Sequence, residues 1–472
     1  MAANLNLPDP RNVVATLVRC ARAAQGQFQR YTQEQVDEVV TAAGWAIMKP
    51  ENNRVLADMA VADSGLGNAQ DKYDKNYRKT LGLLRDLKGA KSVGVIAEYP
   101  QLGLVEIARP VGVVAVITPS TNPGATPANK IINALKGRNA AIIAPSPKGL
   151  STCVKLIEFV HAEFAKIGAP ADLVQHLPSP VTKDLTHELM RQADLVAATG
   201  SQANIRAAYA SGTPAVGVGA GNVVVIVDSS ADLADAAAKI VRSKTFDNAT
   251  SCSSENSAVI LADVYDAMLA ELVRQGGVLL DSVEKQQLEG VMFPNGKLAS
   301  ATTAQSAPRI AELAGLERNA LKTCRFIMVE ESGTGRSCPF SGEKLAPVLA
   351  IYRARDFDEA FSITRDIYNY QGRGHSVGIH TRDNGNVMRL GLELEVCRVI
   401  VNQAHCIATG GAFDNGLPFS LSMGCGTWGR NSFSENMNYR HFLNTTRIAR
   451  VIPENIPSDE DLFGSFWKKC GK

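Results

Sequence analysis

Hydrophobic positions repeat with two different periods along the chain, and the change of period divides the sequence into regions. In the segment "TQEQVDEVVTAAGWAIM" (residues 32–48) apolar side chains recur at helical spacing, and Thr32 with Gln35 predicts a capping box at its start. We therefore expect helices over about the first 90 residues. Residues 93–110 then predict two short strands around a turn, a hairpin that could leave the main body.

From residue 111 to residue 228, strands and helices alternate. The predicted strands are "VGVVAVITP", "AAIIAPS", "DLVAATGS" and "VVVIVD", and the helices "PANKIINALKGRN" and "LSTCVKLIEFVHAEFAKIG" lie among them. Uninterrupted apolar strands between helices are typical of a parallel sheet that is covered on both faces. A second series of this kind follows residue 230, so we predict an α/β fold with two parallel-sheet domains.

The same pattern suggests where the domains begin and end. We expect residues 1–92 and 110–228 to form one domain and residues 229–430 a second. Residues 93–109 and 440–472 would form a small β arm and a tail, which could pair with the sheet edge of another subunit. A chain of 472 residues has room for two or three cores, because single cores stop growing near ~250–300 residues.

Composition narrows the class of protein. The chain is 45% hydrophobic and 20% charged with a net charge of only +2, which does not favour binding to nucleic acid. The start lacks the pattern of a secretory signal, and the apolar runs are too short to span a membrane. Nine cysteines without a C-x-x-C pair predict neither a disulfide framework nor a metal site. We expect a cytoplasmic protein.

Acidic residues are missing from two windows of the sequence. Between Glu106 and Glu158, and again from Leu195 to Val227, there is no Asp or Glu. These windows contain the turns "TPSTNPGATPAN", "APSPKG", "ATGSQAN" and "GVGAGN". Strand-end turns and helix starts bind phosphates, so a dinucleotide fits this pattern, although buried α/β segments can simply be short of acids. No G-x-G-x-x-G fingerprint occurs, so the site would not be an ordinary Rossmann site.

One cysteine stands out by its context. Cys252, in "NATSCSSENSAVILA", lies in the connection between a predicted helix and a predicted strand, among Ser251, Ser253 and Ser254. A residue in such a connection can face a cleft, but no neighbouring cation explains a lowered thiol pKa. Cys425, in "SMGCGTWG", also lies in a Gly-rich turn. These residues alone leave the choice between the two cysteines open.

Several sequence motifs occur in the same order as in a known enzyme family, and this resemblance favours Cys252 over Cys425. The segments "STNPGATPANKIINALKGRN", "AATGSQANIRAAYASGTPAVGVGAGN", "FDNATSCSSENS", "GEKLAPVLAIYRARDFDEA" and "MGCGTWGRNSFSENM" resemble the CoA-acylating branch of the aldehyde dehydrogenase superfamily. The resemblance implies a cofactor-binding domain (1–92 and 110–228), a catalytic domain (229–430) and an oligomerisation arm. It also implies a homodimer or homotetramer.

The resemblance assigns roles to individual residues. Cys252 matches the nucleophile, and Asn122 matches the amide that stabilises the oxyanion together with the Cys252 N–H. Glu343 matches the carboxylate that holds the nicotinamide ribose. The residues expected to contact the cofactor are Thr118, Ser120, Ser146, Lys148, Thr199, Gly200, Ser201, Gly219, Gly221 and Glu343.

A missing carboxylate predicts the product. Hydrolytic aldehyde dehydrogenases carry a Glu in the glycine-rich strand entry, whereas the matching "GVGAGN" here has none. Without that base the thioester should resist water and wait for the thiol of coenzyme A. Three alternatives remain: a hydrolytic enzyme of the same fold, an acyl-phosphate reductase, and a catalytically silent scaffold.

Cofactor and substrate follow less directly. "APSPKG" lacks a carboxylate for a free 2′-hydroxyl and offers Lys148 to a 2′-phosphate, so we expect NADP, with NAD as the alternative. "NPGATPANKIINALKGRN" and "GGAFDNG" resemble the subgroup that acts on small anionic aldehydes, with sulfoacetaldehyde first and succinate semialdehyde or acetaldehyde as alternatives. Arg373 and His405 are candidates for the anionic tail, unless each simply satisfies local hydrogen bonds.

Overall fold

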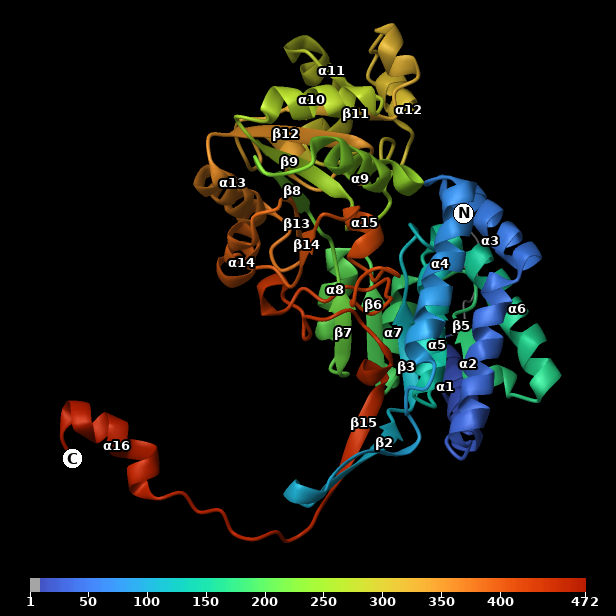
Figure 1. The fold of residues 1–472 in the computed structure, drawn as a ribbon. Helices are drawn as coiled ribbons and strands as arrows, with labels where there is room; N and C mark the ends of the chain where they lie inside the picture. Colours follow the sequence, from blue (N-terminus) through green and yellow to red (C-terminus); the bar gives the residue numbers. More distant parts are fainter. Residues whose placement is uncertain (1–8) are drawn as a thin grey trace.

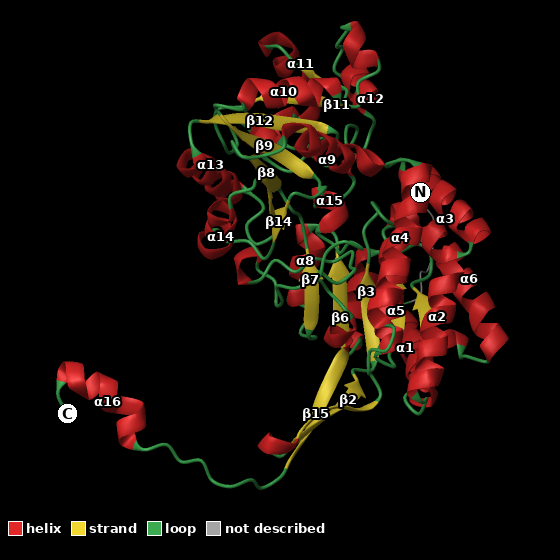
Figure 2. Cartoon of the chain, viewed as in Figure 1, coloured by secondary structure: helices red, strands yellow, loops and turns green. Residues whose placement is uncertain are grey.

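Continuous apolar segments form the central strands of the two largest sheets, and residues 9–472 contain three sheets in all. The structure is a computed structural model (Figure 1), and the first eight residues of the predicted first domain lie outside the described residues. Two sheets are parallel, and Figure 2 shows helices packed around them. The third sheet is a small antiparallel arm.

The first domain is built on a five-stranded sheet in the order β5-β4-β3-β6-β7. Every residue of β3 and β4 is buried, as uninterrupted apolar strands predict. The predicted capping box of α2 is confirmed, because Thr32 and Gln35 bond reciprocally. The strands are β3 (Val113–Ile117), β4 (Ala140–Ala144), β5 (Val174–His176), β6 (Leu195–Thr199) and β7 (Ala215–Val218). The helices are α1 (Pro10–Phe28), α2 (Gln33–Met48), α3 (Pro50–Ser64), α4 (Ala69–Leu87), α5 (Ala125–Lys136), α6 (Leu150–Ile167), α7 (Lys183–Gln192) and α8 (Gln202–Tyr209).

The second domain is built on a seven-stranded sheet in the order β10-β11-β12-β9-β8-β13-β14. Its strands are β8 (Val223–Val227), β9 (Glu255–Leu261), β10 (Gly277–Leu279), β11 (Phe326–Glu330), β12 (Val348–Ala354), β13 (Val377–His380) and β14 (Val399–Val401). Its helices are α9 (Leu233–Thr245), α10 (Tyr265–Arg274), α11 (Ser282–Met292), α12 (Ala307–Leu313), α13 (Phe357–Tyr370), α14 (Asn384–Glu393) and α15 (His405–Ala408).

Two segments lie in a different domain from the one the sequence suggested. β8 was placed at the end of the first domain, but it pairs with β9 and β13 in the second sheet. We therefore propose a boundary between β7 and β8. Phe419, Phe433 and Phe442 return to the first domain and pack into its hydrophobic core. Large apolar side chains are buried in whichever hydrophobic core lies near them in space, irrespective of their position in the chain.

The predicted hairpin forms the arm. β1 (Gly94–Tyr99) and β2 (Leu104–Pro110) pair antiparallel, and β15 (Leu443–Ala449) adds to the free edge of β2. The arm projects from the first domain, and an extended segment carries the chain on to α16 (Asp459–Cys470), far from the body (Figure 1). The sequence did not suggest α16. Pairing of the arm with another subunit stays a prediction.

None of the helices of residues 9–472 combines the length and the apolar character needed to cross a bilayer.

Candidate active site

The turn that carries Cys252 has an unusual backbone. Between α9 and β9, Asp247, Asn248 and Ala249 have φ values of +50°, +50° and +59°. Side chains on L-residues make this left-handed region unfavourable by roughly 1–2 kcal/mol per residue. Such a run persists only where surrounding contacts hold it.

Helix α4 supplies those contacts. Both Lys72 and Lys75 form buried ion pairs with the Asp247 carboxylate, at 3.1 and 2.5 Å. The Asn68 N–H also donates to this carboxylate, and the Asp71 carboxylate accepts from the Asp247 N–H. Burial alone would raise the pKa of Asp247, but the charges of the two lysines outweigh it and hold that pKa below its usual value. The turn that carries Cys252 is thus anchored to the first domain.

Lys75 extends this network to Asn122. Its ammonium donates to Asn122 Oδ1 at 2.8 Å as well as to Asp247. Because an ammonium only donates, this bond fixes the carbonyl end of the amide toward Lys75 and turns the Nδ2 donor away from it. One lysine therefore positions both the cysteine turn and the amide.

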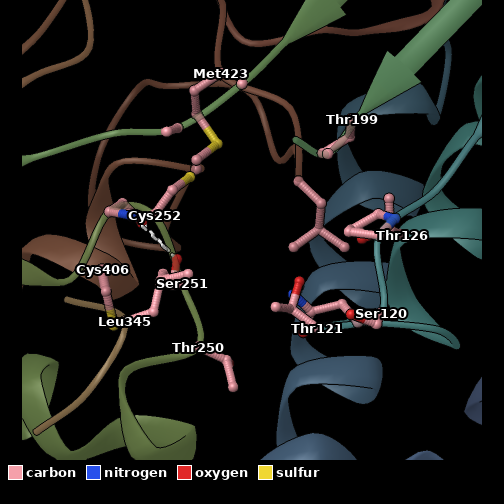
Figure 3. A pocket seen from close by; sticks show the side chains of 18 of the residues that line it. Ser120, Thr121, Thr126, Thr199, Thr250, Ser251, Cys252, Leu345, Cys406 and Met423 are labelled. Atoms are coloured by element: carbon pink, nitrogen blue, oxygen red, sulfur yellow. Dashed lines mark hydrogen bonds between the residues drawn. The ribbon is translucent and has the colours of Figure 1, made fainter. Parts of the chain in front are cut away.

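Cys252 and Asn122 line the same cavity of about 310 Å³ between the two domains. Figure 3 shows Cys252 on one wall and Thr126 and Thr199 on the opposite wall. The other lining residues singled out in the sequence are Ser120, Gly200, Ser201, Gly219 and Glu343. The structure thus brings Asn122 and Glu343, which are 221 positions apart in the chain, to one cavity.

The nearest base to the cysteine was missed in the sequence. His375 Nε2 lies 3.5 Å from Cys252 Sγ, and His375 Nδ1 bonds Ser376 Oγ at 2.7 Å. Burial, with Arg398 nearby, lowers the pKa of His375 to about 3, and burial raises the pKa of Cys252. The proton therefore rests on the Cys252 sulfur and not on His375. His375 stands two positions after Arg373 in "GRGHS", and nothing local pointed to it.

Cys425 has a different environment from Cys252. Its Sγ donates to the Met423 carbonyl, and its side chain packs into the core of the first domain. It faces a separate, smaller cavity of about 120 Å³, and burial raises its pKa to about 12. No histidine or other base is among its hydrogen-bond partners within residues 9–472.

Glu343 is held beside the cysteine turn. Its Oε1 accepts from the Gly221 N–H at 3.2 Å, and burial raises its pKa to about 8. A Cβ at Gly221 would lie 2.5 Å from the Cys252 carbonyl oxygen, so this position needs glycine. Glu343 is the one carboxylate among the described residues that line the cavity.

A second cavity, of about 380 Å³, continues from the first along the carboxyl ends of β3, β4 and β6. The two share Ser120, Gly200 and Ser201, and the second adds Thr118 and Ser146. The Thr118 hydroxyl is buried without a partner in the described chain, and Ser201 caps the N-terminus of α8. A dinucleotide fits this groove, since its phosphates can meet free donors.

Other cations of the acid-free windows have structural roles. Lys130 bonds Ser422 Oγ, Lys136 pairs with Asp37, and Arg138 donates to backbone carbonyls, all from buried positions. Lys148 lines a neighbouring groove with Asp63, whose carboxylate accepts from Ser151 and Thr152. The turn "APSPKG" has no carboxylate of its own, but α3 places the Asp63 carboxylate beside it.

The two residues suggested for the anionic tail do not line the cysteine cavity. Arg373 pairs with Glu395 at the surface. His405 is 1% exposed, and its Nδ1 bonds the Ser253 carbonyl and the Thr409 hydroxyl. Both sets of contacts agree with the alternative that Arg373 and His405 satisfy local polar interactions.

Comparison with known proteins adds the family. A profile described as "Aldehyde dehydrogenase family" matches residues 9–285, and sulfoacetaldehyde dehydrogenase (acylating) of Cupriavidus necator is 62% identical over 97% of this chain and 93% of its own. The chain belongs to the aldehyde dehydrogenase family.

Two further relatives extend this result. Succinate-semialdehyde dehydrogenase (acetylating) of Clostridium kluyveri is 38% identical, over 96% of this chain and 99% of its own. The crystal structure of an acetylating aldehyde dehydrogenase from Geobacillus thermoglucosidasius has a TM-score of 0.91 at 34% identity, covering 96% of this chain and 100% of that one. The aldehyde dehydrogenase-like α/β fold inferred from the motifs is confirmed.

Proposed function

We propose that this aldehyde dehydrogenase is CoA-acylating, and that it oxidises sulfoacetaldehyde to sulfoacetyl-CoA with a nicotinamide cofactor. The observation that carries the proposal is that Cys252, Asn122 and Glu343 line one cavity, and that His375 lies within hydrogen-bonding distance of the cysteine sulfur. Similarity to the acylating enzyme of Cupriavidus necator supports the substrate. Succinate semialdehyde and acetaldehyde are the alternative substrates.

The first half of the reaction forms a thioester on Cys252. His375 Nε2 takes the thiol proton as Sγ bonds the aldehyde carbon, and the resulting oxyanion accepts from Asn122 Nδ2 and the Cys252 N–H. One such donor is typically worth about 3–4 kcal/mol. When bound, nicotinamide accepts the hydride that leaves the former aldehyde carbon.

The second half transfers the acyl group. The thiol of coenzyme A loses its proton to solvent and attacks the thioester carbon, and the released Cys252 thiolate takes back the proton that His375 holds. Because "GVGAGN" holds no carboxylate, water lacks the base that hydrolytic relatives place there. Each step is reversible, so the enzyme can also reduce the acyl-CoA.

The cofactor groove suggests which residues hold the nucleotide. Thr118, Ser120, Thr199, Gly200 and Ser201 would lie along the pyrophosphate, with Gly219 and Gly221 close to the nicotinamide end. Glu343 would accept from the hydroxyls of the nicotinamide ribose, and Ser146 would lie near the adenosine ribose.

For the choice of cofactor we propose NADP, with Lys148 on the 2′-phosphate. The carboxylate of Asp63 lies in the same groove but is already engaged by Ser151 and Thr152. Comparing kcat/KM for NADP and NAD tests this choice, and a strong preference for NAD would contradict it.

One assay tests the proposed function. Sulfoacetaldehyde, coenzyme A and NADP should give reduced cofactor and sulfoacetyl-CoA, and leaving out coenzyme A should stop turnover after the enzyme is acylated. Steady production of free sulfoacetate at the same rate without coenzyme A would identify a hydrolytic enzyme. Glu343 is the one lining carboxylate that could act as its base.

We also propose that the protein forms a homodimer or homotetramer through the arm. Light scattering would measure the number of subunits.

A further inference from the structure

Helix α4 places a third lysine on its buried face. Lys79 follows Lys75 by one helical turn, is 5% exposed and lines the same cavity as Cys252. Its ammonium donates to the carbonyl oxygens of Gly410 and Gly411, at 2.6 and 3.4 Å. Lys79 is therefore a buried basic side chain in the wall of the cavity that Cys252 also lines.

Unlike its neighbours, this lysine has no acidic partner. Lys72 and Lys75 pair with Asp247, whereas Lys79 forms no ion pair within residues 9–472. Burial, with the charges of Arg78 and Lys75, holds the pKa of Lys79 well below its usual value, and the more distant Asp86 and Cys406 only partly oppose this. A buried ammonium without an anion is costly, so such positions are kept where an anion binds.

The surroundings leave room for that anion. Two carbonyls occupy two of the three N–H donors of an ammonium, which leaves one for a ligand. A Cβ at Gly410 would lie 2.7 Å from Lys79 Nζ, so glycine at this position keeps the ammonium free of steric contact. Gly410 and Gly411 begin "GGAFDNG", one of the segments that resembles enzymes of anionic aldehydes.

We propose that Lys79 binds the sulfonate of the substrate and so sets the preference for anionic aldehydes, an inference that rests on the proposed function. Lys79 is the one basic side chain among the described lining residues, and Glu343, the one carboxylate there, offers no positive charge to an anion. Lys79 therefore marks the end of the cavity that binds the sulfonate. The carbonyl carbon of the same substrate would face Cys252.

The variant Lys79→Met tests the proposal, because it keeps the length of the side chain and removes its charge. We expect kcat/KM for sulfoacetaldehyde to fall about 10- to 100-fold, as for a lost hydrogen bond to a charged group, while kcat/KM for acetaldehyde changes less than about threefold. Lys79→Arg should keep much of the preference. Equal losses with both aldehydes would overturn the proposal.

Arg78→Met is the matched control. Arg78 is the neighbouring, half-buried cation on the same helix, donates to the Ile407 carbonyl and does not line the cavity. Its loss should leave the ratio of the two kcat/KM values unchanged, even if stability falls. A control variant that loses the preference as strongly as Lys79→Met would also contradict the proposal.

Ligand binding gives a readout that needs neither turnover nor a folded variant. Calorimetry on the wild-type enzyme should detect binding of ethanesulfonate, and ethanesulfonate should compete with acetaldehyde. Its uncharged analogue ethyl methyl sulfone should do neither, and equal binding of the two would overturn the proposal. If the wild-type enzyme lacks CoA-dependent turnover, the proposed function fails, whereas intact CoA dependence with no selectivity loss in Lys79→Met refutes the role of Lys79 alone.

Discussion

The turns around Cys252 and Cys425 are similar in sequence and different in structure. Both are rich in small residues, and burial raises the pKa of both thiols. Cys252 lies beside His375 Nε2 and lines the cavity of about 310 Å³ between the domains, whereas Cys425 donates a hydrogen bond to a carbonyl and packs into a hydrophobic core. A neighbouring base and a cavity distinguish Cys252, the proposed nucleophile, from Cys425, whereas the composition of the two turns does not.

The two turns also differ in backbone conformation. Next to Cys425, Gly426 adopts a φ of +58°, which costs glycine little. Ahead of Cys252, Asp247, Asn248 and Ala249 adopt positive φ values without glycine, and the ion pairs from α4 hold them there. Backbone strain is thus found in the turn that positions the Cys252 sulfur. Such strain is usually concentrated at functional sites.

Replacing each cysteine by alanine tests this difference most directly. Cys252→Ala should lower CoA-dependent turnover on the order of 10⁴-fold or more, because the nucleophile is gone. Cys425→Ala should stay within about threefold of wild type in rate and lose about 1–3 kcal/mol of stability through its cavity. Initial rates and thermal unfolding measure both, and an inactive, folded Cys425→Ala enzyme would contradict the assignment.

Removing the base should have the next largest effect. His375→Asn should reduce kcat about 10²- to 10⁴-fold, the range for loss of a general base. The matched control is His161→Asn, since His161 bonds the Val174 carbonyl and lines neither cavity. Single-turnover formation of reduced cofactor would show whether proton removal from Cys252 is slowed, and an unchanged rate would exclude His375 from that step.

The anchor of the strained turn can be tested at Lys75. Lys75→Met should lower kcat about 10- to 100-fold, because Asn122 and Asp247 lose a shared donor. Breaking a buried pair should also cost about 3–5 kcal/mol of stability. The control is Lys136→Met, which breaks the pair with Asp37 far from the cysteine and should lower stability with little change in kcat. Equal kcat losses in both variants would contradict a positioning role for Lys75.

The smallest effect concerns the pH dependence of cofactor binding. The raised pKa of Glu343, about 8, means that the group is neutral below pH 8 and a carboxylate above it. Because a carboxylate is the better acceptor for ribose hydroxyls, KM for the cofactor should fall roughly tenfold between pH 7 and pH 9, in proportion to the ionised fraction. In Glu343→Gln this dependence should vanish; its persistence would assign it to another group.

Elements with strong local patterns could be predicted. Uninterrupted apolar segments identified β3, β4 and β9, and Thr32 with Gln35 marked the start of α2. The partner of a strand has no such signal, so β8 was assigned to the wrong sheet. α16 follows a proline-containing acidic stretch, which hid its helical pattern.

The residues of the candidate site also divide into those that sequence motifs predicted and those that only the structure revealed. Motifs around Cys252, Asn122 and Glu343 pointed to these residues, and the structure places all three at one cavity. His375 and Lys79 escaped notice because an isolated histidine or lysine has no motif. Arg373 and His405 looked suitable by charge, but their contacts lie elsewhere.

The amino-acid sequence by itself determined the α/β class and the family and indicated which cysteine to propose as the nucleophile, since periodicity and motifs are local properties of the chain. Tertiary structure alone decided which base faces the thiol, which amide the buried Lys75 orients and which lysine is left without a carboxylate. The physical reason is that these properties depend on distance and burial between segments far apart in the chain. Only folding sets those distances.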